Sequence, residues 1–455
     1  MRPRKSISVT SGLSVGFALA SLWLLGAGAV EASRRADSPH VILITVDTLR
    51  ADRLSGYGYE RPTSPNLDAL FATGVRFEVA RTVEPLTGPG LSSMVTSLYP
   101  HQHGATRNGV RMREGLPSFT KILQRRGYAT AAFVSNWTLS DHVSGLGEHF
   151  DVFEPVLTRR RWFFWSGESS ADDINEAAME WLRKRRRADP DQRVALWVHY
   201  VEPHGPYEYH EEFAERLGIA DQTAGRRNRY DTEVAFVDDR IGRFLSSVEE
   251  VLGDEDRLVV FTSDHGESLG EHNYWGHGRH CYEPGLRIPL SFSWPGRIPP
   301  GTVTAPALII DISQTLLGLL GLPTQPTFQG YDWSPVLVDG ADPPEGRTSW
   351  HQAHRGAVKA TSSEQVRQRG LLEVARVAGG TKEILRVTNG NRRLYDLTRD
   401  PGEEDSEVDK GSAPSPELAG WLEIVRQGLA RSDELPPPVL TDEEIERLRA
   451  LGYLD

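Results

Sequence analysis

Cysteine is nearly absent from this chain, with Cys281 the single example among 455 residues. One cysteine cannot form an intrachain disulfide, so an apolar core has to hold the fold in any redox compartment. A chain of this length has room for one large domain or two unequal ones. Its 38% hydrophobic and 25% charged residues are typical of a folded protein and exclude disorder for most of the chain.

Excess positive charge is lacking as well. Acidic residues outnumber basic ones by 63 to 51, and the net charge at pH 7 is −12. Nucleic-acid binding needs a basic stripe or patch, so we expect no nucleic-acid partner. The basic run at residues 183–187 is better explained as a solvated helix end, where positive charge faces the negative end of the helix dipole.

Long apolar runs are confined to the N-terminus. Residues 1–32 combine a basic start, an apolar run and small residues up to Ala32, the layout of a secretory signal peptide. We expect cleavage after Ala32 and export to the periplasm or the extracellular space. The alternative is an uncleaved segment that anchors the protein on the outer side of a membrane, because the apolar run is close to spanning length. Only in that case would the protein contact a membrane.

Short runs rich in β-branched residues predict buried parallel strands of an α/β sheet at residues 40–47, 195–200 and 258–264. Amphipathic segments between them predict helices at residues 64–73, 172–187, 232–252 and 310–321. After about residue 340 the runs become short and are separated by turn residues, which predicts a smaller antiparallel sheet. A Pro-rich acidic stretch and a short capped helix are expected at residues 433–455.

Two of the predicted strands end in an acid, Asp47 and Asp264. In open α/β sheets the functional site lies beyond the carboxyl ends of the strands, so these side chains are candidates to converge. His265 follows Asp264 directly, and a neighbouring carboxylate and imidazole can bind one metal ion. By itself Asp-His-Gly is a weak signal, because a polar turn produces the same pattern.

Thr87 stands before Gly88, Pro89 and Gly90, ahead of a helix predicted to start around Leu91. Such a turn would place the hydroxyl beside the free N–H groups of the helix start, where an anion is favoured. A metal on this oxygen would lower its pKa and make it a nucleophile. A threonine in this context is also typical of a turn in which the hydroxyl bonds to backbone, and the segment alone favours that simpler explanation.

Eight segments resemble the sulfatase family of the alkaline phosphatase superfamily, in order and in spacing. They are HVILITVDTLRADRLSGYG, LYPHQHG, RRGYATAAFVSNWTLS, VEPHGPY, YDTEVAFVDDRIGRFL, TSDHGESLGEH, YEPGLRIPLSFSWPG and LYDLTRDPGEE. The resemblance covers nearly the whole chain after the signal region. It implies a doubly wound mixed α/β sheet with helices on both faces at residues 38–340, and a smaller antiparallel sheet at residues 341–432. It also implies a metal-assisted hydrolase or transferase of sulfate or phosphate esters.

The resemblance also assigns roles to single residues. Asp47, Asp264 and His265 match family metal ligands, and Thr87 matches the nucleophile, which also contacts the metal. His204 and His277 match positions that contact the substrate or the leaving group; a structural histidine explains His277 equally well. Calcium, manganese, magnesium and zinc all remain candidates for the divalent ion.

Four positions depart from the family pattern. Thr48 replaces a second acidic ligand, and Thr87 replaces the Cys or Ser that sulfatases convert to formylglycine. Leu91 and Asn136 stand where the family has an Arg and a substrate-binding Lys. The loss of both cations weakens the stabilisation of a transferring sulfuryl group, so the formylglycine route is not expected.

A threonine nucleophile resembles the phosphodiesterase and phosphoglycerol-transferase relatives of the superfamily, in which it becomes covalently phosphorylated. The main hypothesis is therefore an exported metal-dependent enzyme whose Thr87 attacks a phosphate ester, with phosphodiesters favoured, or a sulfate ester. Two alternatives stay open. One is a sulfuric ester hydrolase with an unmodified threonine, and the other is a catalytically silent relative that binds anionic glycans or lipid head groups.

Overall fold

The computed structural model describes residues 38–158, 170–219, 225–355, 370–408 and 411–432, together with the backbone of two short strands at residues 160–161 and 164–165. The expected signal peptide at residues 1–32 and the expected helix within residues 433–455 lie outside these described residues. Among the described helices, none has both the length and the apolar composition that a membrane span requires.

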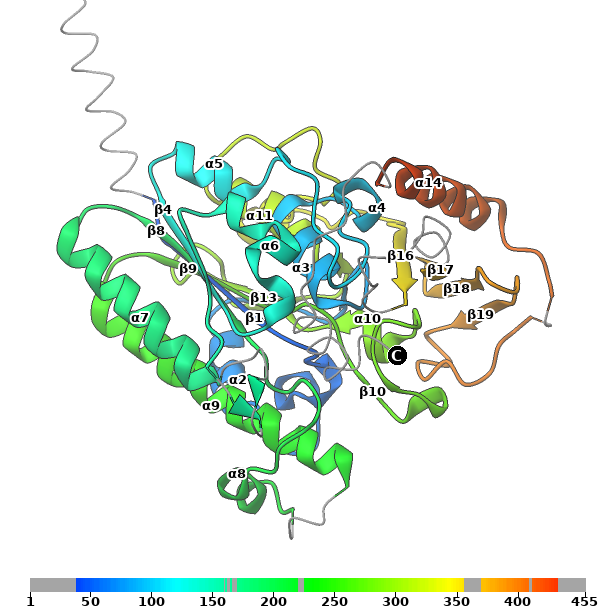
Figure 1. Ribbon diagram of the computed structural model, residues 1–455, viewed down its shortest axis with the longest axis horizontal. Helices are drawn as coiled ribbons and strands as arrows, with labels where there is room; N and C mark the ends of the chain where they lie inside the picture. Colours follow the sequence, from blue (N-terminus) through cyan, green and yellow to red (C-terminus); the bar gives the residue numbers. More distant parts are fainter. Residues whose placement is uncertain are drawn as a thin grey trace, which may run out of the picture. The chain divides into compact units, whose positions relative to one another are not determined.

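An eight-stranded mixed sheet forms the centre of the large part of the chain (Figure 1). Its strand order is β14-β2-β13-β9-β1-β8-β4-β5. Five neighbouring strands are parallel: β9 (Arg257–Ser263), β1 (His40–Val46), β8 (Val194–Tyr200), β4 (Ala129–Val134) and β5 (Val152–Pro155). An antiparallel strand, β13 (Leu290–Ser293), joins them to the parallel pair β2 (Val75–Phe77) and β14 (Gly301–Val303). All three strands predicted from the sequence therefore occupy the middle of the sheet.

Helices cover both faces of this sheet, as the resemblance implied (Figure 1). One face carries α2 (Pro65–Phe71), α7 (Ala171–Ala188) and α9 (Arg226–Leu252). The other carries α3 (Thr87–Thr96), α5 (Phe119–Arg125) and α11 (Asp311–Leu319). Alternate residues of β1 enter the two cores, with Val41 and Leu43 on one side and Ile42 and Ile44 on the other. This double burial explains why the strand reads as a continuous apolar run.

The start of α3 is a correction to the sequence-based expectation. The helix begins at Thr87 and not around Leu91. Pro89 fits the first helical turn because its fixed φ is helical and its missing N–H needs no partner there. Thr87 is therefore a residue of the helix itself, and its side chain is held with the rigidity of that helix.

The predicted antiparallel sheet is also present. It consists of β16 (Ser349–His354), β17 (Leu371–Ala378), β18 (Thr381–Arg386) and β19 (Arg392–Asp396) in sequence order. The last described helix, α14 (Pro416–Ser432), follows it. Trp421 of this helix packs against Tyr99 and His101, at the start of α4 (Pro100–His103). The small sheet and the large sheet thus share one apolar core.

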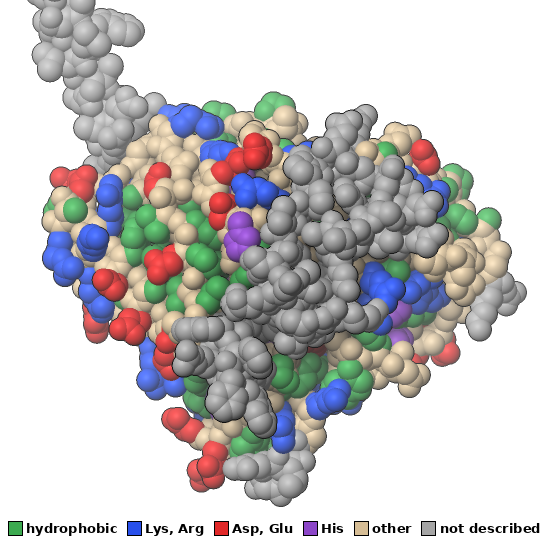
Figure 2. Space-filling view, in the orientation of Figure 1, with side chains coloured by type: hydrophobic (Ala, Val, Ile, Leu, Met, Phe, Trp, Pro, Cys, Tyr) green, Lys and Arg blue, Asp and Glu red, His purple; other side chains and the backbone are tan. Residues whose placement is uncertain are grey.

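Charged side chains on the face shown in Figure 2 are mixed in sign, with Lys and Arg interspersed among Asp and Glu. A different arrangement exists in the interior. The side chain of Lys382 is fully buried, with Nζ 3.0 Å from Glu283 Oε1 and 2.7 Å from Glu403 Oε1. Arg81 pairs with the same Glu283 at 2.8 Å. This cluster joins β18 to α10 (Glu283–Leu286), close to the loop that follows β9.

Replacing Lys382 with alanine is expected to lower the free energy of unfolding by about 3–5 kcal/mol, since the buried carboxylate of Glu403 would lose its cation and Glu283 would keep only Arg81. Urea unfolding followed by circular dichroism measures this change. Arg399→Ala is the control, because the Arg399 side chain is 72% exposed and its pair with Asp396 is solvated. Equal unfolding midpoints for the two variants would contradict the prediction.

Candidate active site

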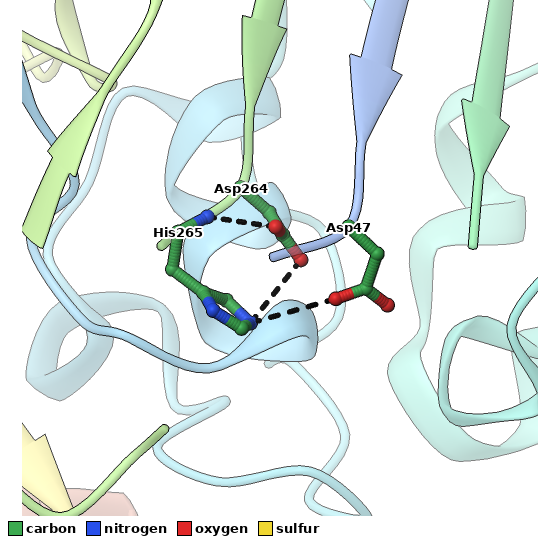
Figure 3. A group of neighbouring side chains, drawn as sticks. All are labelled: Asp47, Asp264 and His265. Atoms are coloured by element: carbon green, nitrogen blue, oxygen red, sulfur yellow. Dashed lines mark hydrogen bonds and ion pairs between the residues drawn. The ribbon is translucent and has the colours of Figure 1, made fainter. Parts of the chain in front are cut away.

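Asp47 and Asp264 converge at the carboxyl edge of the sheet, as their positions at the ends of two strands predicted. Val46 of β1 lies opposite Ser263 of β9, so the next residue of each chain leaves the sheet beside the other. The imidazole of His265 points between the two carboxylates (Figure 3). Its Nε2 lies 3.7 Å from Asp47 Oδ1 and 3.4 Å from Asp264 Oδ2.

These three side chains fit a divalent cation. Each offers one ligand atom, and the three atoms lie within 4.8 Å of one another in a fully buried group. Within the described part of the chain, Asp47 Oδ1 and Asp264 Oδ2 accept no hydrogen bond. Burial and the neighbouring charge of Asp47 raise the pKa of Asp264, which shows how poorly two carboxylates tolerate each other here. Two oxygens and one nitrogen around one point are a common donor set for such an ion.

The backbone around His265 fixes which ring nitrogen faces the carboxylates. Nδ1 lies 2.8 Å from the carbonyl of Gly266, which can only accept, so Nδ1 carries the hydrogen and Nε2 is the free lone pair. Burial lowers the pKa of His265 to about 3 and favours this neutral form. Gly266 is required at this turn, because a Cβ there would lie 2.1 Å from the carbonyl oxygen of Pro284.

Thr48 holds the other side of the site in a strained conformation. Its φ is 55°, which is unusual for a β-branched residue and costs of order 1–3 kcal/mol. Its N–H donates to Asp264 Oδ1 at 3.1 Å, and its carbonyl accepts from the hydroxyl of Tyr230 at 2.8 Å. This conformation lets the N–H of Thr48 hold Oδ1 of Asp264, while Oδ2 faces His265.

Thr87 lies in the same site. Its Oγ1 is 3.4 Å from His265 Nε2, and its hydroxyl partly offsets the effect of the burial that raises the pKa of Asp264. The neighbouring N–H groups of α3 are not free, contrary to the expectation. Gly88 N–H donates to Asn108 Oδ1 at 2.8 Å, Gly90 N–H donates to the carbonyl of Leu86 at 2.8 Å, and Pro89 has no N–H. An anion beside Thr87 therefore cannot use the N–H groups of Gly88 or Gly90.

The loop that leads into Thr87 is bound by β16 of the small sheet. Gln352 N–H donates to the carbonyl of Val83 at 3.0 Å. His354 contacts the Glu84 carboxyl twice, through its N–H at 2.8 Å and through Nδ1 at 3.0 Å. The C-terminal sheet therefore positions the candidate nucleophile, although no residue of that sheet was among the predicted site residues.

His204 and His277 lie next to the three candidate ligands. The ring centroid of His277 is 4.5 Å from that of His265 and 5.2 Å from that of His204. His277 Nδ1 is 3.2 Å from Glu267 Oε1. Although burial acts to lower it, the pKa of His277 is raised by the carboxylate of Glu267. The tertiary structure thus brings together all six residues proposed from the sequence; their chemical roles stay proposals.

Two further residues contact Asp47. Asn136 Nδ2 donates to Asp47 Oδ2 at 2.8 Å, while its Oδ1 accepts from Thr138. His199 Nε2 lies 3.8 Å from the same oxygen of Asp47. Sequence reasoning treated Asn136 only as a lost lysine and missed His199. The signal for His199 was a polar residue near the end of an otherwise apolar central strand.

Comparison with known proteins identifies the family of this chain. The sulfatase profile matches residues 39–322, which is more than half of the chain. The chain belongs to the sulfatase family. As a member, it is a hydrolase of sulfuric or phosphoric esters; members generally depend on a metal ion, and Asp47, Asp264 and His265 form the corresponding cluster. A profile for the C-terminal region of N-sulphoglucosamine sulphohydrolase matches residues 270–415.

Individual relatives of this sulfatase-family chain are distant. The uncharacterized sulfatase YidJ of Escherichia coli K12 is 26% identical over 343 residues, which are 62% of this chain and 67% of that protein. An N-acetylglucosamine-6-O-sulfatase of Bacteroides thetaiotaomicron is 24% identical over 69% of this chain and 73% of its own length. The crystal structure of phosphonate monoester hydrolase of Agrobacterium radiobacter has a TM-score of 0.66 and 20% identity, covering 89% of this chain and 99% of that one. This likeness confirms the fold.

Asp264→Asn is expected to weaken divalent metal binding by at least about 10²-fold, because it replaces a ligand oxygen. Oδ1 accepts two backbone N–H groups, so the amide oxygen keeps that place and the NH₂ group falls where the ligand oxygen was. Isothermal titration with calcium, manganese, magnesium and zinc measures the affinity. Asp52→Asn, which removes a charge from a half-exposed residue, is the control. Equal affinities in the two variants would exclude Asp264 as a ligand.

Proposed function

We propose that this protein is an exported metal-dependent ester hydrolase or transferase in which Thr87 attacks a bound phosphate ester, preferably a phosphodiester, or a sulfate ester. The observation that carries the proposal is the position of Thr87 Oγ1, 3.4 Å from Nε2 of His265, one of the three candidate metal ligands. Thr87 is the hydroxyl residue among the predicted site residues, and it is the first residue of α3.

Asp47, Asp264 and His265 would hold the ion, with Thr87 as a fourth ligand. A divalent ion held there supplies positive charge that stabilises a deprotonated nucleophile and the oxygens of the ester. Carboxylate oxygens suit calcium, magnesium and manganese, whereas the imidazole also suits manganese and zinc.

The proposed reaction is a two-step transfer of the phosphoryl or sulfuryl group through Thr87. The hydroxyl of Thr87 would lose its proton to water as its oxygen bonds to phosphorus or sulfur, because a divalent ion beside it lowers the pKa of the hydroxyl. The esterified threonine is then released by water, or by an acceptor alcohol in a transferase.

His277 is proposed to protonate the leaving group. Its Nδ1 is engaged by Glu267, and this carboxylate raises the pKa of His277 against the effect of burial, as an acid at neutral pH requires. Its ring packs between His265 and His204, which places it beside the cluster and next to a second imidazole. His204 is proposed to contact the substrate from the same side.

Three features support phosphodiesters over the formylglycine chemistry of sulfatases. Thr87 cannot be oxidised to formylglycine. Leu91 replaces a family arginine and is buried in the apolar core. Asn136 replaces a family lysine and gives its amide to Asp47. A site with two fewer cations favours an ester that carries a single negative charge, as phosphodiesters and sulfate monoesters do.

The names of the relatives indicate which kind of molecule could carry the ester. One is named an N-acetylglucosamine-6-O-sulfatase, and a structure with a TM-score of 0.67 was solved with its substrate D-glucosamine-2-N,6-O-disulfate. These names support an anionic glycan as the group that carries the ester, with a lipid head group as the other candidate. They also favour sulfate esters as the second candidate for the bond that is cleaved.

Thr87→Ala is expected to lower kcat at least about 10³-fold, because the covalent step is lost. The measurement compares an aryl sulfate, an aryl phosphate and a bis-aryl phosphate, each with calcium, manganese, magnesium or zinc. Thr96→Ala is a matched control, since Thr96 lies in the same helix and bonds only its own backbone turn through Ser92. Unchanged turnover in Thr87→Ala would refute the nucleophile assignment, and the preferred ester would decide between phosphodiester and sulfate.

His277→Gln is expected to slow esters of poor leaving groups, such as alkyl alcohols, about 10²-fold. Esters of 4-nitrophenol should be affected much less, because that leaving group departs without a proton. The ratio of kcat/KM for the two ester types is the measurement. The exposed His142, changed to Gln, is the control. An equal loss for both ester types would mean that His277 has no role as an acid.

A further inference from the structure

His199 is a buried histidine near the end of β8, and its side chain lies beside Thr45 of β1. The two residues are direct partners in the parallel pairing of these strands, and both are fully buried. Nδ1 of His199 lies 2.9 Å from Oγ1 of Thr45. Trp197 points to the same face of β8 and donates its indole N–H to the same oxygen at 2.8 Å. The hydroxyl of Thr45 therefore lies between two ring nitrogens.

These contacts determine which ring nitrogen of His199 carries the hydrogen. An indole N–H can only donate, so Trp197 occupies one lone pair of the Thr45 oxygen. The single hydroxyl hydrogen of Thr45 can go to Nδ1 of His199 at 2.9 Å or to the carbonyl of Val198 at 3.4 Å, and the shorter contact favours the ring. Nδ1 is then the acceptor, so the hydrogen of the neutral ring is on Nε2.

The surroundings of Nε2 favour the same tautomer. Nε2 of His199 is buried, makes no hydrogen bond to the part of the chain that the structure describes, and lies 3.8 Å from Oδ2 of Asp47. A lone pair facing a carboxylate at this distance would be repelled in a fully buried site, whereas an N–H is attracted. The two ends of the ring thus independently place the hydrogen on Nε2.

The carboxylate of Asp47 has one engaged oxygen and one open oxygen. Oδ2 accepts from the amide of Asn136 at 2.8 Å and faces Nε2 of His199. Oδ1 accepts no hydrogen bond from the described residues and lies 3.7 Å from Nε2 of His265. Because both donors act on Oδ2, they oppose rotation of the carboxylate. Oδ1 is thereby kept on the side of the candidate metal ligands.

We propose that His199 is a positioning residue for Asp47. Its Nε2–H, fixed in place by the hydroxyl of Thr45, holds Oδ2 of the carboxylate and so leaves Oδ1 to bind the ion. This inference rests on the proposed function, because it takes Asp47 as a metal ligand. Groups that orient a metal ligand from behind change metal affinity by about 10–100-fold when they are replaced.

Two substitutions of His199 separate this role from the filling of space. Asparagine keeps a polar atom near the position of Nδ1, beside Thr45, but has no donor near Asp47. Glutamine reaches the position of Nε2 with an NH₂ donor. We expect His199→Asn to bind manganese at least about 10-fold more weakly than wild type in isothermal titration, and His199→Gln to bind it nearly as tightly. His142→Asn, which removes an exposed imidazole, is the control. Equal affinities of the Asn and Gln variants of His199 would overturn the proposal.

The tautomer is measured directly by NMR on wild-type, metal-free protein labelled with ¹⁵N histidine. The ring of His199 is identified by its nuclear Overhauser contacts to Thr45 and Trp197. We expect the hydrogen on Nε2, and a hydrogen on Nδ1 would overturn the proposal even if neither variant folds. Because this measurement needs no ion, it decides on the tautomer separately from the metal. Wild-type protein that binds no divalent ion would refute the proposed function instead.

Discussion

The parallel pairing of β1 with β9 is the constraint on which the site depends. The register places Val46 opposite Ser263, so Asp47 and Asp264 leave the sheet side by side. A slip of one residue would turn one of these carboxylates to the other face of the sheet. Two buried carboxylates at this separation repel each other, and the structure keeps both turned toward His265. A cation bound there would offset this cost, so the candidate metal site depends directly on the strand register.

The second half of the site comes from the far end of the chain. β16 binds the loop before Thr87 through backbone and side-chain contacts at Val83 and Glu84. The buried cluster around Lys382 ties the same small sheet to the segment that follows the β9 loop. The C-terminal sheet therefore positions the loop before Thr87, the candidate nucleophile, and contacts the segment that follows Asp264 and His265.

Two positions of the site, Leu91 and Asn136, carry uncharged side chains. Where the resemblance to sulfatases implies an arginine and a lysine, this chain has Leu91 in the core and Asn136 bonded to Asp47. Two amide side chains lie here instead: Asn136 donates to Asp47, and Asn108 accepts from the N–H of Gly88. Neutral donors lower the attraction for doubly charged esters and leave geometry to discriminate between substrates. The substitutions thus act together, since each changes the same electrostatic balance.

The sequence by itself determined the α/β class, the three central strands and the convergence of Asp47 with Asp264. These followed because strand periodicity and the carboxyl-edge rule depend on local pattern alone. The tertiary structure decided the start of α3, the bond from Asn136 to Asp47 and the contact of Asn108 with Gly88. The sequence does not show whether the oxygen or the NH₂ group of an asparagine side chain will find a hydrogen-bond partner. That depends on backbone groups brought close by chain segments far apart in sequence, and only the folded structure shows which donors remain free.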